Sequence, residues 1–312
     1  MDLCQTGFCG MAPIMDEFRR FQKPLAQKNK AICYLPPMDG PSALEKMVEA
    51  LPPRIICDKL VGSYIYNGEK TLRVLHLPSF LRECQQFWED PESHATPFPG
   101  FIPQLYTVML IGSGFDTAND FAGGLAKHGL TRSSVCLLVA AWLDDLNWKQ
   151  RIELSTMQTQ VILHTAHKLC TSLPVEKVWN DAGRLVRSAI TMGLHRDPSE
   201  FPNISIFEGE LRRRLWGTIA EIDLQASLLT GCCTAIREGD FNCRPPTNCD
   251  DLELYPDMTE YPVSKAVDEW SDCSCQVLLA RYVYLRYFFN FPVKGLQNPQ
   301  SASSQIPGFK PC

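Results

Sequence analysis

The chain has 312 residues, of which 45% are hydrophobic, and it carries a formal net charge of −5 at pH 7. This apolar fraction is sufficient for a sizeable buried core in one large domain or two small ones. An acidic chain is a poor candidate for autonomous DNA binding, because neutralising phosphates requires clustered lysines and arginines. No apolar run reaches the ~18–20 residues of a membrane span, and the N-terminus lacks the pattern of a secretion signal.

Fourteen cysteines are an unusual feature of the composition. No two of them have the C-x2-C spacing that structural zinc sites usually use. Many lie in apolar helical patterns, where a free thiol behaves as a small hydrophobic group. We therefore interpret most of them as buried reduced thiols. Six cysteines fall between Cys232 and Cys275, so an adventitious metal site in that segment is the alternative.

Composition divides the chain into three parts. Residues 1–40 read as a flexible lead-in, in which five basic residues lie between Arg19 and Lys30. This charge run fits a solvated tail better than a nuclear-import patch. Residues 41–292 are predicted to form one helical domain, and residues 293–312 form a polar tail rich in Pro, Gly and Ser.

Helical periodicity dominates the predicted domain, and no segment shows the sustained alternation of a β-strand. The fold class is therefore all-α, a single irregular multi-helix domain with disordered termini. Ser42 and Glu45 form a capping box that opens a short first helix. Ser79 can cap a later helix. His76, between apolar neighbours, is interpreted as a packed histidine and not a ligand. Apolar helices that should lie inside the bundle are predicted near 103–112 and 133–146, with a longer helix near 152–172.

Two long amphipathic helices follow in the second half. The first begins after Pro174 and ends at Gly193, which fits the left-handed position after a helix. Ser205 opens the second, a helix of about 24 residues that ends at Gly231. A last helix near 276–290 is apolar all round, which predicts an exposed patch and self-association.

Three consecutive arginines, Arg212, Arg213 and Arg214, form the most conspicuous charge run. On a helix they point in three directions about 100° apart, so they cannot form one flat DNA-reading face. Glu208 and Glu210 lie four residues before Arg212 and Arg214, where ion pairs form readily. We interpret the run as salt-bridging between helices in preference to phosphate binding.

Asp223 borders the apolar stripe of the second long helix. A carboxylate in that position requires a partner, because an unpaired buried charge is costly. Three arginines of the preceding helix and its junction could supply one, namely Arg184, Arg187 and Arg196. We predict that one of them pairs with Asp223.

Catalytic motifs are weak in this chain. His195-Arg196-Asp197 spells the protein-kinase tripeptide, but the glycine-rich loop and the downstream kinase motifs are missing. Asp144-Asp145 resembles the start of the magnesium motif of all-helical terpene synthases, although Trp148 replaces its final acid. Asn180-Asp181 begins the second metal motif, but Arg184 stands where Ser or Thr is needed. A helical enzyme acting on diphosphates is therefore only an alternative.

The order of motifs from Val178 to Asp251 resembles the middle homology region, the regulatory domain of fungal zinc-cluster transcription factors. Two earlier stretches, LPPRIICDKLVGSYIYN and RVLHLPSF, resemble the entry to that domain, so the likeness covers about residues 51–291. In the family, the residues of the helix junction and of the second long helix are thought to hold the two long helices together. We interpret the corresponding residues of this chain as structural: Gly193, Leu194, His195, Arg196, Asp197, Pro198, Arg213, Arg214, Leu215, Trp216 and Asp223.

The resemblance implies a nuclear regulator of metabolic genes that forms homo- or heterodimers with related regulators and has no membrane partner. Zinc and DNA contact in the family come from an upstream six-cysteine cluster, whose spacing this chain lacks. We therefore assign no cofactor, no catalytic or metal residue and no DNA-binding residue, and expect DNA to be met only indirectly. A non-DNA-binding modulator or a degenerate fragment is the alternative, because the polar tail stands where the family's domain has further helices.

Overall fold

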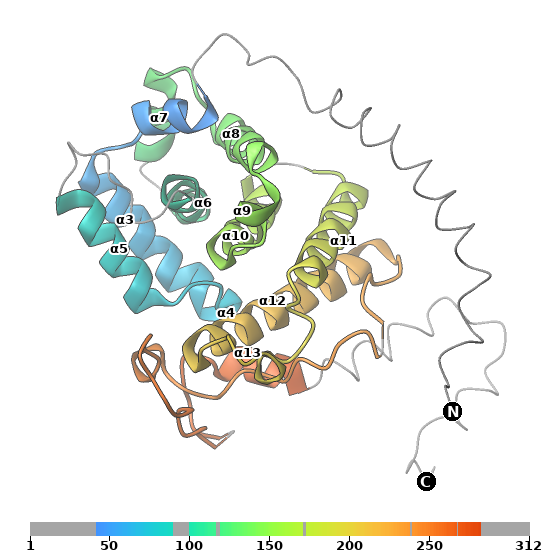
Figure 1. Ribbon diagram of the computed structural model, residues 1–312. Helices are drawn as coiled ribbons and strands as arrows, with labels where there is room; N and C mark the ends of the chain where they lie inside the picture. The colour runs from blue at the N-terminus through green and yellow to red at the C-terminus, as the bar shows by residue number, and fades with distance from the viewer. Residues whose placement is uncertain are drawn as a thin grey trace, which may run out of the picture. The chain divides into compact units, whose positions relative to one another are not determined.

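The computed structural model describes residues 42–89, 100–116, 119–170, 173–237, 239–266 and 268–281, and every regular element among them is helical. The predicted all-α class is thereby confirmed for these residues. The described residues from Ala43 onward form one compact unit (Figure 1). The predicted lead-in, the polar tail and the last helix beyond Arg281 lie outside the described residues, as does the apolar patch expected there.

A fully buried helix forms the centre of the first half. Every residue of α6 (Phe101–Ser113) is buried, and Figure 1 shows it end-on among its neighbours. It packs against α2 (Ala43–Glu49), α3 (Arg54–Tyr64), α8 (Arg132–Asp145) and α10 (Leu154–Cys170). An apolar sequence without a polar face is stable only when surrounded in this way. The prediction for this helix is therefore confirmed.

Helices α3 and α6 approach so closely that only glycine fits at their crossing. A Cβ atom added to Gly112 would lie 2.1 Å from the backbone oxygen of Leu60. No rotamer change relieves a clash with backbone, so either helix would have to move. This contact fixes the distance between the two helices.

Helix α8 differs from the expectation that it lies wholly inside the bundle. Val135, Cys136, Val139 and Trp142 are buried, whereas Leu137 is 69% exposed. One face packs against the bundle and the other faces solvent. Apolar composition alone did not distinguish this half-exposed helix from the enclosed α6.

The shorter elements depart further from the prediction. The helix expected over 152–172 is α10 (Leu154–Cys170), whereas α9 (Trp148–Arg151) and α7 (Asp120–Lys127) were not predicted. A π-helical turn, η1 (Ile65–Glu69), runs into α4 (Lys70–Leu72). Ser79 lies inside α5 (Leu77–Glu89) and does not cap it; its Oγ is 2.8 Å from His76 Nδ1.

The two long helices of the second half match their predicted ends. Helix α11 (Val175–Thr191) is followed by Gly193 at φ 82°, and α12 (Ile206–Thr230) by Gly231 at φ 63°. Ser205 caps α12 by accepting a hydrogen bond from the Glu208 amide (3.2 Å). Helices α11 and α12 pack against each other, and the chain then continues through two short elements, η3 (Asp251–Glu253) and α13 (Ser274–Arg281).

None of the described helices combines the length and the apolar character that a membrane crossing requires.

Candidate functional site

The three arginines of α12 point to three different carboxylates. Arg212 pairs with Glu208 on its own helix (Nε–Oε1 2.8 Å). The other two are almost fully buried and reach carboxylates outside the helix. This divergence is what consecutive positions on a helix produce. The run therefore connects α12 to two other segments of the chain, and the partners lie at short 3₁₀ turns and not on another long helix.

The first of these connections is a junction cluster formed by Asp197, Arg213, Arg244 and Glu210. Asp197 directly precedes η2 (Pro198–Glu200), a short 3₁₀ helix between α11 and α12. Arg213 donates two hydrogen bonds to its carboxylate, Nε to Oδ2 (3.1 Å) and Nη2 to Oδ1 (2.9 Å). Arg244, from the loop after α12, donates a second pair to the same oxygens, at 3.1 and 3.0 Å. One carboxylate therefore ties the junction, α12 and the loop together.

Electrostatics in the junction cluster keep Asp197 ionised. Burial by itself would raise its pKa, but the hydrogen bonds from Arg213 and Arg244 outweigh that effect. The pKa of Asp197 lies well below its usual range as a result. Asp197 is thus held as an anion whose oxygens are occupied by arginine donors.

Glu210 completes the cluster with a partner that differs from the predicted one. Its Oε1 accepts from Arg213 Nη1 (2.5 Å), three residues away, and not from Arg214 at four residues. Its Oε2 accepts from the backbone amide of Thr247 (2.9 Å). Glu210 is fully buried. It lies against the loop after α12, and that loop supplies its second hydrogen-bond donor.

The second connection is the Asp251 cluster, formed by Asp251, Arg214, Arg73 and His76. Arg214 Nη1 donates to Asp251 Oδ1 (2.6 Å), and Arg73 donates to the same oxygen. Arg73 follows α4 with a left-handed backbone at φ 49°. His76 Nε2 lies 2.9 Å from the backbone oxygen of Asp251. The cluster binds the first half of the domain to the loop across α12, which gives His76 the packed role predicted for it.

Next to this cluster lies a buried acid. Glu69, the last residue of the π-helical turn, accepts hydrogen bonds from the Tyr64 hydroxyl and from the Leu75 amide (2.8 Å). Its burial raises the pKa of its carboxyl to about 7, although Tyr64 and Arg73 act in the opposite direction. Glu69 is therefore poised to change protonation near neutral pH.

Asp223 is buried, as its position predicts, but its described partners are different. Its carboxylate accepts from the backbone amides of Ala235 (3.0 Å) and Ile236 (3.1 Å). Arg196, one of the three arginines proposed to pair with it, bonds Glu200 instead. Through these contacts Asp223 holds the loop after Gly231 against α12. Sequence periodicity located the buried carboxylate but could not show which chain segment approaches it.

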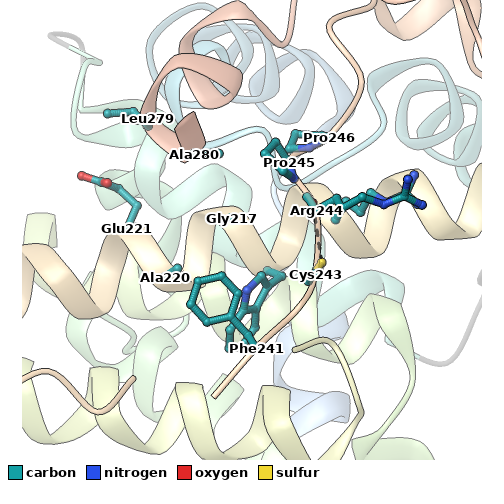
Figure 2. A pocket seen from close by; sticks show the side chains of 12 residues that line it. Gly217, Ala220, Glu221, Phe241, Cys243, Arg244, Pro245, Pro246, Leu279 and Ala280 are labelled. Carbon is teal, nitrogen blue, oxygen red and sulfur yellow. Dashed lines mark hydrogen bonds between the residues drawn. The ribbon is translucent and has the colours of Figure 1, made fainter. Parts of the chain in front are cut away.

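A shallow, mainly apolar hollow lies beside the junction cluster (Figure 2). The segment that carries Phe241, Arg244 and Pro245 crosses α12 next to Gly217 and Ala220. Trp216 also lines the hollow and is buried, and its ring lies 5.6 Å from that of Phe241. Leu194 and Leu215 belong to the same continuous core, while the backbone oxygen of His195 accepts from the Asn242 and Cys243 amides. The motif residues thus pack the junction against the loop.

The positions of the possible metal ligands and of the thiols bear on the enzyme alternative. No three His, Cys, Asp or Glu side chains among the described residues are placed to hold a metal ion. Burial raises the pKa of Cys57, Cys84, Cys243 and Cys249 to about 12, so these thiols are uncharged at neutral pH. Asp144 and Asp145 end α8 at an exposed position, and Asp181 pairs with Lys177. The magnesium motif of the diphosphate-enzyme alternative therefore does not assemble.

Comparisons with known proteins identify the class to which this scaffold belongs. Residues 62–275 match the family described as fungal specific transcription factor domain. The chain belongs to this family, which is a family of transcription factors and not of enzymes. The matched range includes both charged clusters and both long helices. No solved structure matches the chain.

Curated relatives carry related names. The chain is 29% identical over 242 residues to the transcription factor opdR of Penicillium oxalicum, covering 77% of this chain and 29% of that protein. It is 27% identical over 267 residues to the equisetin cluster transcription factor eqxF of Fusarium heterosporum, covering 80% and 37%. The Zn(2)-C6 fungal-type transcription factor pigI of Monascus ruber is 29% identical over 223 residues, covering 70% and 26%. The matched part therefore spans only about a quarter to a third of these relatives.

Proposed function

We propose that this chain regulates transcription in the nucleus through protein contacts of its helical domain, without reading DNA bases itself. Membership of the family supports the regulatory role. One structural observation supports the proposal that the chain does not read DNA bases. The arginines of the most basic run, Arg213 and Arg214, are only 4% and 1% exposed, and both are bound to carboxylates. Cations held in this way are not accessible to phosphate oxygens.

The proposed targets are the genes of a metabolic cluster. Two relatives are named as the equisetin cluster and the fusarisetin A cluster transcription factors. Another is named as a Zn(2)-C6 factor, whereas the cysteines of this chain have no C-x2-C spacing that would fit such a zinc site. The proposed partners are related regulators, in a homo- or heterodimer, and DNA contact is assigned to no residue of this chain.

The experiment is deletion of the gene in the fungal strain that carries it, followed by transcript profiling. Reintroduction of the full chain should restore the transcripts of a contiguous set of biosynthetic genes, and a tagged copy should concentrate in the nucleus. Gly112→Val, which separates two core helices, should behave as the deletion. Gly124→Ala, in open space on α7, is the matched control and should behave as the wild type. An unchanged transcript profile, or a tagged chain kept out of the nucleus, contradicts the proposal.

A further inference from the structure

One loop of the domain is strongly acidic. The acidic-aromatic loop, residues 252–270, joins η3 to α13 and contains five carboxylates against a single lysine. That lysine, Lys265, is partly buried and pairs with Asp250 and with Glu253 (3.6 Å). Asp257, Glu260 and Asp268 are exposed and have no ionic partner within the described part of the chain. The loop therefore has four more carboxylates than lysines, and its surface is negative.

The same loop exposes large apolar side chains. Leu252, Val263 and Trp270 are between 78% and 87% exposed, and Tyr255 and Tyr261 are about half exposed. Single exposed apolar residues are ordinary, but several gathered on one segment mark an interaction surface. In Figure 1 the dark orange segment before α13 lies outside the helical bundle. These side chains are consequently accessible to another protein.

The loop is held in place by the domain. Leu254 and Met258 are buried against Ile206 and Phe207 at the start of α12. The side-chain amide of Asn248 donates to the backbone oxygens of Lys265 (3.3 Å), Ala266 (3.0 Å) and Glu269 (3.3 Å). The exposed aromatic and acidic side chains are thus presented from an ordered backbone, so part of the ordering cost of binding is met in advance.

We propose that the acidic-aromatic loop is a docking surface for a partner protein that presents an apolar helix face bordered by lysines and arginines. Charge complementarity selects this partner: the negative loop steers a basic surface toward it, and the exposed aromatic side chains pack against the apolar face. A second copy of this chain would bring the same negative loop against itself, which is unfavourable. The biological setting rests on the proposed function, whereas the binding itself does not.

The first test uses a defined probe and the full chain. The probe is a fluorescein-labelled amphipathic peptide with leucines on one helical face and lysines along both borders, and binding is followed by fluorescence anisotropy at about 0.15 M salt. Two double variants should each weaken binding by at least about tenfold: Val263→Ala with Trp270→Ala, and Asp257→Lys with Glu260→Lys. A probe with serines in place of the leucines should bind the wild-type chain at least about tenfold more weakly.

The matched control is Leu137→Ala with Trp148→Ala, which removes two equally exposed apolar side chains from α8 and α9. It should bind the probe as the wild type does. Absence of binding, or equal losses in control and loop variants, overturns the proposal. So does a concentration-dependent dimer in sedimentation velocity that the loop variants abolish, because the occupant would then be a second copy. None of these results would alter the transcript profile that tests the proposed function, so the two failures are distinguishable.

Discussion

Asp197 and Arg213 form a two-point ion pair between the α11–α12 junction and the second turn of α12, with both side chains about 95% buried. Sixteen residues separate them in sequence. Because Arg244 binds the same carboxylate from the loop, the pair is also the point where three chain segments meet. This contact holds the junction against α12 and the loop.

Removal of either member of this pair should destabilise the domain strongly. We expect Asp197→Ala or Arg213→Ala to lower the free energy of unfolding by ~3–5 kcal/mol, because the remaining charge stays buried without its partner. Arg212→Ala is the matched control from the same helix; its pair with the exposed Glu208 should contribute only ~0–1 kcal/mol. Urea denaturation of the purified variants measures both. Equal effects of Arg212→Ala and Arg213→Ala would contradict the assigned geometry.

The local features of this junction were predictable from sequence, and its long-range partners were not. Gly193, Gly231 and Ser205 mark helix ends through backbone preferences that act over a few residues. Burial of Asp223 followed from helical periodicity. By contrast, Arg73, Arg244 and Asp251 lie in loops or at helix ends, where no periodicity shows which side chains they meet. The backbone partners of Asp223 have the same origin, because Ala235 and Ile236 approach it through a turn that the sequence pattern does not specify.

The glycine that ends α11 should resist replacement by a branched residue. Gly193 has φ 82° and open space around its missing Cβ, so strain in the backbone is the only obstacle. We expect Gly193→Val to cost ~1–2 kcal/mol. Gly193→Asn should cost less, because asparagine tolerates the left-handed conformation. Thermal unfolding of the two variants checks the order, and an unchanged midpoint for Gly193→Val would show that the backbone conformation is different.

Gly112, where α3 and α6 cross, should also resist replacement, but for a steric reason. Gly112→Ala places a methyl group against the Leu60 carbonyl, so we expect a loss of ~1–3 kcal/mol or more from forced separation of the helices. Gly62→Ala is a suitable control, because it also lies in a helix but has open space at its Cβ, and it should be neutral or stabilising. Chemical denaturation of both variants provides the comparison. A fully stable Gly112→Ala variant is incompatible with this packing.

Glu69 should make the stability of the domain depend on pH. Its folded-state pKa of about 7 is above the ordinary value of 4.5, so the folded state holds the proton more tightly than the unfolded state. The stabilisation that comes from this raised pKa is complete below pH ~4.5 and is lost as the pH rises through ~7. The free energy of unfolding falls by up to about 3 kcal/mol over that range.

Glu69→Gln removes the titration and retains an acceptor for the Leu75 amide. The stability difference between variant and wild type should therefore shift in favour of the variant as the pH rises from 5 to 8. His164, whose burial lowers its pKa to about 4, titrates in both proteins and cancels in this difference. Denaturation midpoints measured across that pH range should diverge; parallel profiles would show that Glu69 does not titrate there.

The most direct test of the central claim is selection of DNA sequences by the purified full chain. The chain is incubated with a pool of random duplexes at about 0.15 M salt, bound DNA is recovered over several rounds, and affinities are measured on the products. We predict no enriched motif and no complex in the ~10⁻⁸–10⁻¹¹ M range of specific binders, because Arg213 and Arg214 are committed to Asp197 and Asp251. An enriched motif bound in that range and lost on scrambling would contradict the claim that this chain regulates through protein contacts alone.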